Sequence, residues 1–524
     1  MSLGYVAARC SLRTLLWPSR ISLNQRPAAL LRRTMSSLPV DSAHIETVLK
    51  YARLDSKGYI EVEGPEAVKF LNGLVTSKLQ ASFVKKNLTT IGNDSGSGGP
   101  QRSTEEATVP LADFDVTKTN WGLYHEAGPT GPYISRFGQY TSFLDGKGKL
   151  ITDSILYPVP VTVPNLMKTR YPKYLLEFDK KEMLGRMLQT LRGHKLLSKV
   201  KISAVEEDAV RTWEMSIALE GMPDVVESAW ITNIWRPMTT LKSPGDASEF
   251  TNGLVQSLFH GHEDKIRALY LDWRMDGLVQ RTAEEPLVFR IVTDNTVDDV
   301  STLFNKDVFD FELNVVPENK ASFRKERLRC GLLDGTGDVK PSTVLPLELN
   351  FDYFPDVVNS NKGCYIGQEL TARTFATGIL RKRMISVTIE NPAALAEYLR
   401  NCNATGNTSY PEVEIRTVGG TAEEVQSAEP LAASPFGSSS KPVRKRRRPV
   451  GSLLASEDDT AVVMMRTEYF GKIYGNSEGE IGNAELYIDT SDESGKESGA
   501  TEIKLTPQRP LWMDQWLQSN KPNF

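Results

Sequence analysis

Strand and helix patterns follow one another in a fixed order between residues 57 and 205, and this order constrains the fold more than any other feature. Strand-like alternation occurs at 57–63, 141–144, 149–157, 173–178 and 199–205. Pro65 stands where a helix would begin, and the apolar stripe over 183–191 has helical spacing. Asp145-Gly146-Lys147-Gly148 is typical of a tight turn between paired strands. The order predicts an α+β fold with ferredoxin-like elements.

The second half of the 524-residue chain has fewer continuous patterns. Residues 324–329 are basic with helical character, and apolar segments at 450–454, 461–466 and 503–505 indicate strands of a small barrel. Ser, Gly, Pro, Ala and Glu dominate residues 405–441, which predicts a disordered insert. We expect an N-terminal α+β region at 41–205, an insert at 206–268, a second α+β region at 269–385, and a C-terminal β-barrel from 386–404 and 442–515.

The first forty residues differ in composition from the rest of the chain. They hold six arginines and several serines, with no Lys, Asp or Glu. This composition is typical of a mitochondrial transit peptide and predicts location in the matrix. The alternative is a disordered basic tail. A secretory signal fits less well, because arginines interrupt every candidate apolar core.

The cysteines limit what metal chemistry the chain can support alone. There are four, Cys10, Cys330, Cys364 and Cys402, and no two have C-x-x-C spacing. Because Cys10 lies in the predicted transit peptide, three remain. A [4Fe–4S] cluster usually needs four thiolates, so we expect no self-contained iron–sulfur cluster. His260 and His262 lack a third ligand, and no metal site is predicted.

Charge and hydropathy bear on possible partners. The net charge of −4 gives no general attraction for nucleic acid. No apolar run approaches the length of about 18 residues that a membrane span needs. The basic run at 444–448 abuts the predicted insert, and we interpret it as a solvated loop patch. Docking of an acidic partner and binding of nucleic acid are the alternatives.

The segment Lys362-Gly363-Cys364-Tyr365-Ile366-Gly367-Gln368-Glu369 is the most informative motif. Two glycines bracket the cysteine and allow unusual backbone angles. Lys362 lies two residues from the thiol, and Arg373 follows within about two helical turns. A nearby cation would favour the thiolate, which is the nucleophilic and metal-binding form. The alternative is a buried structural cysteine in a tight loop.

This motif resembles the signature of the family that contains the bacterial folate-binding protein YgfZ and the mitochondrial assembly factor for [4Fe–4S] proteins. That family is related to the glycine-cleavage T-protein, an aminomethyltransferase. Further segments resemble the family in order, at 70–76, 143–148, 327–331, 346–350 and 447–451, so that the resemblance spans about 45–515. One departure is Asp272-Trp273-Arg274, where the family often has Asp-Pro-Arg.

The resemblance implies a T-protein-like body around a central hole, with a C-terminal barrel. It implies a tetrahydrofolate-type ligand, and we expect Glu348, Tyr365, Gln368, Glu369 and Arg373 to contact it. Cys364, assisted by Lys362, is the expected catalytic residue. The implied partners are iron–sulfur scaffold or A-type assembly proteins, a glutaredoxin, and [4Fe–4S] client enzymes.

Three functions remain open at this point. They are an assembly factor for [4Fe–4S] proteins, a folate-dependent one-carbon transferase, and a non-catalytic folate-binding scaffold. The motif resembles the assembly branch, and aminomethyl transfer needs a base rather than a thiol. Whether the chain is an enzyme stays open, although ancestry alone would class it as a transferase.

Overall fold

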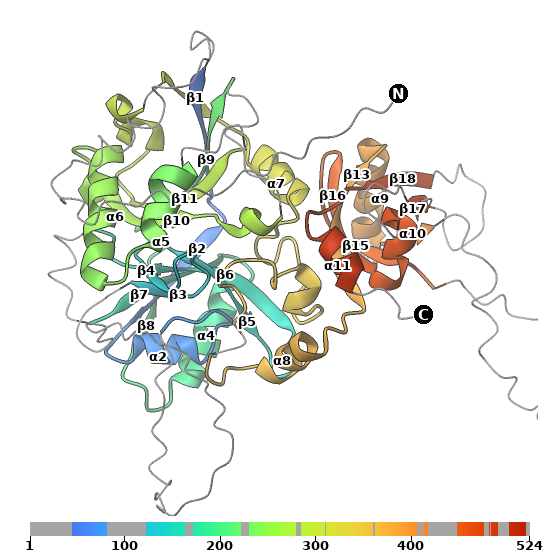
Figure 1. The fold of residues 1–524 in the computed structure, drawn as a ribbon, viewed down its shortest axis with the longest axis horizontal. Helices are drawn as coiled ribbons and strands as arrows, with labels where there is room; N and C mark the ends of the chain where they lie inside the picture. Colours follow the sequence, from blue (N-terminus) through green and yellow to red (C-terminus); the bar gives the residue numbers. More distant parts are fainter. Residues whose placement is uncertain are drawn as a thin grey trace, which may run out of the picture.

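The computed structural model shows an α+β body and a smaller barrel beside it (Figure 1). It describes residues 45–80, 122–162, 171–221, 230–278, 285–309, 311–359, 362–405, 410, 413–417, 448–475, 482, 484–490 and 502–519. The predicted transit peptide and the basic run at 444–448 lie outside these residues, except for Arg448. Within the described ranges, no helix has the length and apolar character needed to cross a membrane.

One half of the body is an antiparallel five-stranded sheet in the order β5–β6–β7–β2–β8. Its strands are β2 (Lys57–Glu63), β5 (Gln139–Leu144), β6 (Leu150–Pro158), β7 (Lys173–Asp179) and β8 (Lys201–Ala204). Helices α2 (Ala67–Asn72) and α4 (Leu184–Lys195) lie together against this sheet (Figure 1). Leu71 of α2 and Met187 and Leu191 of α4 are fully buried. They share one apolar core with Ile60 and Leu176 of the sheet. The predicted order of strands and helices is confirmed, although α2 ends at Asn72 while apolar residues continue at helical spacing to Leu79.

The other half of the body is a mixed sheet in the order β10–β11–β9–β1–β12. Its strands are β1 (Glu46–Arg53), β9 (Val210–Glu220), β10 (Ile266–Leu271), β11 (Leu287–Asp294) and β12 (Leu313–Pro317). Only β1 and β12 run parallel, with Thr47 opposite Leu313. A small hairpin of β3 (Leu123–His125) and β4 (Tyr133–Ser135) lies next to α5 (Arg236–Thr239) and α6 (Pro244–Leu258).

The segment expected to be an insert at 206–268 is in part a core element. Strand β9 pairs with β1 on one side and β11 on the other. Trp213, Met215 and Ile217 alternate along it into the apolar core that α6 covers. The inward alternation of these three residues explains why β9 belongs to the sheet rather than to an appended loop.

The C-terminal domain is a closed barrel in the order β13–β16–β15–β14–β17–β18. The strands are β13 (Lys382–Ile389), β14 (Glu414–Thr417), β15 (Gly451–Glu457), β16 (Thr460–Arg466), β17 (Leu486–Asp489) and β18 (Glu502–Pro507). The expected barrel is therefore confirmed. It begins at Lys382, and it takes β14 from the segment predicted to be a disordered insert. Ile415 of β14 is fully buried, which explains why these few residues are ordered.

The remaining helices are short or peripheral. They are α7 (Lys320–Arg329), α8 (Gln368–Thr377), α9 (Pro392–Thr405), α10 (Phe470–Tyr474) and α11 (Met513–Ser519), with a π-helical turn η2 (Ile231–Trp235) and 3-10 turns η3 (Glu263–Lys265), η4 (Arg274–Gly277), η5 (Val300–Leu303), η6 (Lys306–Val308), η7 (Pro346–Leu349) and η9 (Thr467–Tyr469). Helix α7 contacts β13, β15 and β16, so it joins the body to the barrel (Figure 1).

Candidate functional site

The cysteine motif forms a loop that leads into α8, and Lys362 anchors its start. The Lys362 side chain is buried, and its Nζ donates hydrogen bonds to the carbonyl oxygens of Val75 and, at 2.7 Å, Ser77. The same Nζ lies 4.6 Å from the centre of the Tyr365 ring. These hydrogen bonds therefore connect the motif to residues 75–77, which follow α2.

Two opposing effects act on the pKa of the Lys362 ammonium group. Burial lowers the pKa of its ammonium to about 7. Two carbonyl acceptors and an aromatic face act in the other direction, because they stabilise the charged form. In the described part of the chain, the recorded partners of Nζ are these three groups, and Cys364 is not among them. The structure thus assigns Lys362 a positioning contact.

Cys364 lies on the surface at the exposed part of the motif loop. Among the three cysteines within the described residues, Cys364 is exposed, Cys402 is half-buried and Cys330 is buried. The flanking Gly363 is exposed as well. The motif thiol is therefore open to a macromolecular partner, which a cysteine buried in a tight loop would not be.

The residues expected to contact a folate-type ligand make local contacts within the chain. Gln368 Oε1 accepts from the Tyr365 backbone N–H at 3.3 Å, and Glu348 accepts from the Leu345 N–H at 2.9 Å. Glu369 and Arg373 form an exposed ion pair of 2.8 Å along α8. Burial raises the pKa of Tyr365 to about 12. None of these residues lines the cavity beside α7.

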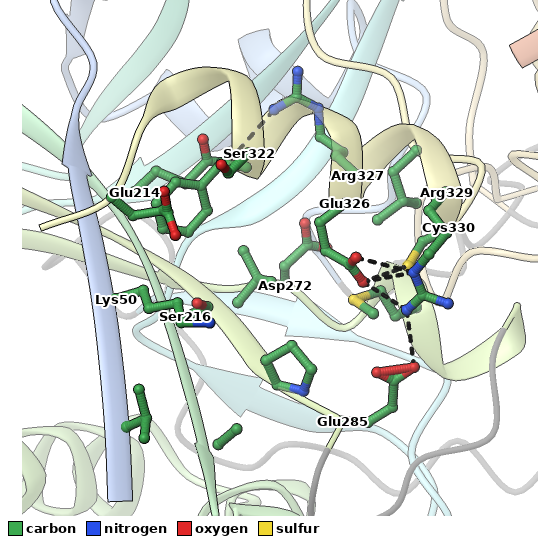
Figure 2. Close-up of a pocket in the computed structure, with 18 of the residues that line it drawn as sticks. Lys50, Glu214, Ser216, Asp272, Glu285, Ser322, Glu326, Arg327, Arg329 and Cys330 are labelled. Carbon is green, nitrogen blue, oxygen red and sulfur yellow. Dashed lines mark hydrogen bonds and ion pairs between the residues drawn. The ribbon is translucent and has the colours of Figure 1, made fainter. Parts of the chain in front are cut away.

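A cavity of about 380 Å³ lies between the sheet strands β1, β9 and β11 and the helix α7 (Figure 2). Its volume is within the range of about 300–1,000 Å³ that small-molecule sites occupy. Apolar walls come from Val48, Met275, Val288, Phe323 and Leu332. Charged groups come from the basic residues Lys50, Arg327 and Arg329 and the acidic residues Glu214, Glu220, Asp272, Glu285, Glu318 and Glu326. Apolar walls together with convergent charged groups suit a flat, polar-edged ligand.

Two buried carboxylates line this cavity, Glu214 and Asp272, and Asp272 is paired with Arg274. The Glu214 Oε1 accepts from Arg290 Nη2 at 3.1 Å and lies 3.6 Å from Arg327 Nη1. The Nε of Arg327, also a wall residue, is buried without a hydrogen-bond partner among the described residues. Both recorded contacts of Glu214 involve the same oxygen, which leaves the second oxygen for a ligand N–H group.

Behind the cavity, a buried network of charges connects the two sheets. Arg290 of β11 donates to Glu177 of β7, to Glu214 of β9 and to Asp334. Lys57 of β2 bonds Asp179 and Asp334, each at 2.9 Å. Burial acts to raise the pKa of Asp334, but the Arg290 and Lys57 cations hold it well below its usual range. The network keeps Glu214 in a fixed orientation.

A second cavity of about 310 Å³ lies between the body and the barrel and is lined in part by Arg509 and Trp512. It shares Glu285, Arg329 and Cys330 with the first cavity. Figure 2 shows Glu326, Arg329 and Cys330 joined by contacts on one side, with Glu214 on the other. Burial raises the pKa of the Cys330 thiol, which donates to Glu326 at 3.6 Å.

Sequence reasoning missed Glu214, Arg290 and Glu177. Each is a charge with a large apolar residue on both sides within a strand, and that pattern is the signal that could have revealed them. Within the described ranges, no group of three or more His, Cys, Asp or Glu side chains is arranged to hold a metal ion.

The fold and the site together define a class: an α+β body with a C-terminal six-stranded barrel, a ligand-sized cavity and a separate exposed thiol. The chain is 39% identical to "Iron-sulfur cluster assembly factor IBA57, mitochondrial" of Saccharomyces cerevisiae, over 91% of each chain. It is 40% identical to the homolog from Kluyveromyces lactis, covering 90% of this chain and 94% of that one. The chain therefore belongs to the family of mitochondrial iron–sulfur cluster assembly factors, which confirms the resemblance noted in the sequence.

The homolog from Candida glabrata is 38% identical and is covered over 99% of its length. A crystal structure of glycine cleavage system aminomethyltransferase T from Bartonella henselae matches 88% of this chain and 85% of its own, with 10% identity and a TM-score of 0.43. No protein-family model matches the chain.

Proposed function

We propose that this protein acts in the maturation of [4Fe–4S] proteins in the mitochondrial matrix, with Cys364 as its reactive thiol. The observation that carries the proposal is the exposed Cys364 on a loop fastened by Lys362, in a chain of the assembly-factor family. An iron–sulfur cluster is the substrate, and a thiolate is a ligand that iron prefers.

The arrangement of thiols supports shared handling of that substrate. Cys330 is buried and holds its proton, so it is not placed to join Cys364 as a ligand. A cluster held through Cys364 takes its other ligands from a partner, such as an iron–sulfur scaffold, an A-type assembly protein or a glutaredoxin. The [4Fe–4S] client enzymes are the recipients.

The cavity beside α7 fits a tetrahydrofolate-type ligand. Glu214 would accept from the N–H groups of a pteridine edge, Arg327 would donate from its unpartnered Nε, and Phe323 and Met275 would contact the ring faces. Such a ligand supplies a reduced pteridine that carries one-carbon groups. Cys364 is not a wall residue, so the thiol and the ligand serve separate roles.

The test uses cells depleted of the protein and rescued with single variants. Cys364→Ser should leave the chain folded and fail to restore [4Fe–4S] enzyme activity, while [2Fe–2S] enzymes stay unaffected. Cys402→Ser is the matched control and should rescue. Full rescue by Cys364→Ser would show that the thiol is not required.

The ligand is tested separately on purified protein. Glu214→Gln should weaken binding of tetrahydrofolate by about tenfold or more, because a charge-assisted hydrogen bond is lost. Cys364→Ser should bind it normally. Equal binding by Glu214→Gln would exclude this cavity as the site.

Matrix targeting is tested by fusing residues 1–40 to a fluorescent protein. Import to a protease-protected position inside the inner membrane is the expected result, since the segment is arginine-rich and free of acidic residues. Fluorescence in the cytosol or the intermembrane space would contradict matrix targeting.

A further inference from the structure

The turn after α4 holds a leucine in a backbone conformation that glycine ordinarily occupies. Leu196 has φ 44° and ψ −117°, and the Ser198 N–H donates to the Lys195 carbonyl oxygen at 2.8 Å. These values match the first central position of a type II′ turn, where a Cβ is unfavourable and Gly is preferred. Leu196 therefore adds backbone strain to the folded state.

The side chains at this turn do not offset that strain by packing. Leu196 is 86% exposed and Leu197 is 96% exposed, the two highest values among large apolar side chains in the described ranges. Single exposed leucines are common on protein surfaces, but two adjacent ones on a strained turn are not. The positive φ of Leu196 costs folding stability that no burial of its side chain offsets, and this favours a contact outside the chain.

The segment that holds this turn is basic, and across the sheet Lys201 of β8 lies opposite Glu63 of β2. From Met183 to Val205 there is no Asp or Glu, and the basic residues are Arg186, Arg192, Lys195, Lys199 and Lys201, with His194. All of these are exposed except the half-buried Lys195. Glu66 accepts a hydrogen bond from the Lys199 backbone N–H at 2.7 Å, and the Lys199 residue is exposed. We call residues 192–201 the basic leucine tip.

We propose that the basic leucine tip docks this protein on an anionic phospholipid bilayer. Leu196 and Leu197 enter the boundary between headgroups and acyl chains, and the surrounding cations contact lipid phosphates. The opposite face of α4 packs inward through Met187 and Leu191, so the fold holds the tip outward.

Shape favours a bilayer over an acidic protein. A stable protein interface buries about 1,200–2,000 Å² with matched surfaces on both sides. The tip offers a convex turn with two apolar side chains, which a soft bilayer accommodates without a preformed pocket. Helices α2 and α4 lie together at this side of the body (Figure 1).

The test uses the chain beginning at Asp41, which keeps every described residue and removes the basic leader. Flotation is measured with vesicles of phosphatidylcholine alone and of phosphatidylcholine mixed with cardiolipin. Binding to the cardiolipin vesicles, weakened by added salt, is the expected result. Equal binding to both vesicles, or to neither, would overturn the proposal.

Two variants separate lipid contact from folding. Leu196→Gly should raise the melting temperature because it relieves the positive φ, yet it should weaken vesicle binding by about tenfold. Leu197→Ser should weaken binding by a similar factor. The matched control is Leu511→Ser, another exposed leucine (54%), which should bind normally. Unchanged vesicle binding by the Leu196→Gly, Leu197→Ser double variant would show that the tip is not a membrane contact.

Discussion

Gly148 and Gly367 face each other so closely that neither position has room for a side chain. A Cβ on Gly367 would lie 3.0 Å from the Gly148 Cα and 2.6 Å from the Asp145 carbonyl oxygen. Both glycines have positive φ, 78° and 79°. The β5–β6 turn and the cysteine motif are thus held together by backbone contact, which fixes the base of the loop that presents Cys364.

Replacing Gly367 by Ala should lower the free energy of unfolding by at least about 1–3 kcal/mol, because the new Cβ meets backbone atoms at a positive φ. Gly148→Ala should act in the same direction. Gly146→Ala is the matched control, since a Cβ there meets nothing within 4 Å. Urea unfolding of the three variants provides the measurement, and equal stability of Gly367→Ala and Gly146→Ala would refute the contact.

Cys364 should react with iodoacetamide faster than Cys330 near neutral pH. Cys364 is exposed, whereas Cys330 is buried and its pKa is raised, so its nucleophilic thiolate is scarce. Mass spectrometry after timed labelling of the folded chain measures both rates, and labelling in denaturant is the control that should equalise them. Faster modification of Cys330 would mean that the body opens more readily than its packing indicates.

The contribution of Asp153 to the free energy of unfolding should fall as the pH rises. Burial and the nearby Asp334 carboxylate raise the pKa of Asp153 to about 6, above its ordinary value of about 4. Between these values the folded state holds more protons than the unfolded state, so this residue's contribution to stability falls as pH rises.

Asp153→Asn removes that titration while an amide can still bond the Gly335 N–H and Tyr140 hydroxyl that Asp153 contacts. Relative to this variant, the natural chain should lose at least about 1 kcal/mol of stability from pH 4 to pH 6. Urea unfolding at several pH values measures the difference. Parallel curves for the two chains would contradict the assignment.

Replacing residues 418–447 by a short Gly-Ser turn should leave the barrel intact. Strands β14 and β15 are antiparallel neighbours, with Ile415 opposite Gly451, so a hairpin turn can join them. The melting temperature and rescue of [4Fe–4S] enzymes should stay unchanged. Removing residues 413–447 is the contrasting variant, and it should unfold the barrel because β14 and the buried Ile415 are lost.

The sequence predicted the features that depend on local spacing. The turn at 145–148 and the strand at 57–63 follow from residues that are neighbours in the chain. The expected ligand-contacting residues came from the family resemblance and not from local spacing; in the structure, Glu369 and Arg373 form an exposed ion pair on α8.

The buried charges could not be predicted as a group, because their partners come from remote segments. Arg290 meets Glu177 at a separation of 113 residues and Glu214 at 76. Similarly, β9 was assigned to an insert because nothing near residues 210–220 shows that its neighbours are β1 and β11. Sheet order and charge pairing are set by topology, which local periodicity does not contain.

The parallel pairing of β1 with β12 affects how the chain folds when it emerges with its N-terminus first. Such emergence occurs from a ribosome or through a translocation pore. β1 is among the first segments to emerge, yet its two neighbours span residues 210–220 and 313–317. Until residue 317 has emerged, the β1 backbone groups that face β12 have no strand to bond. We therefore expect the emerging chain to need a holding chaperone over more than half of its length.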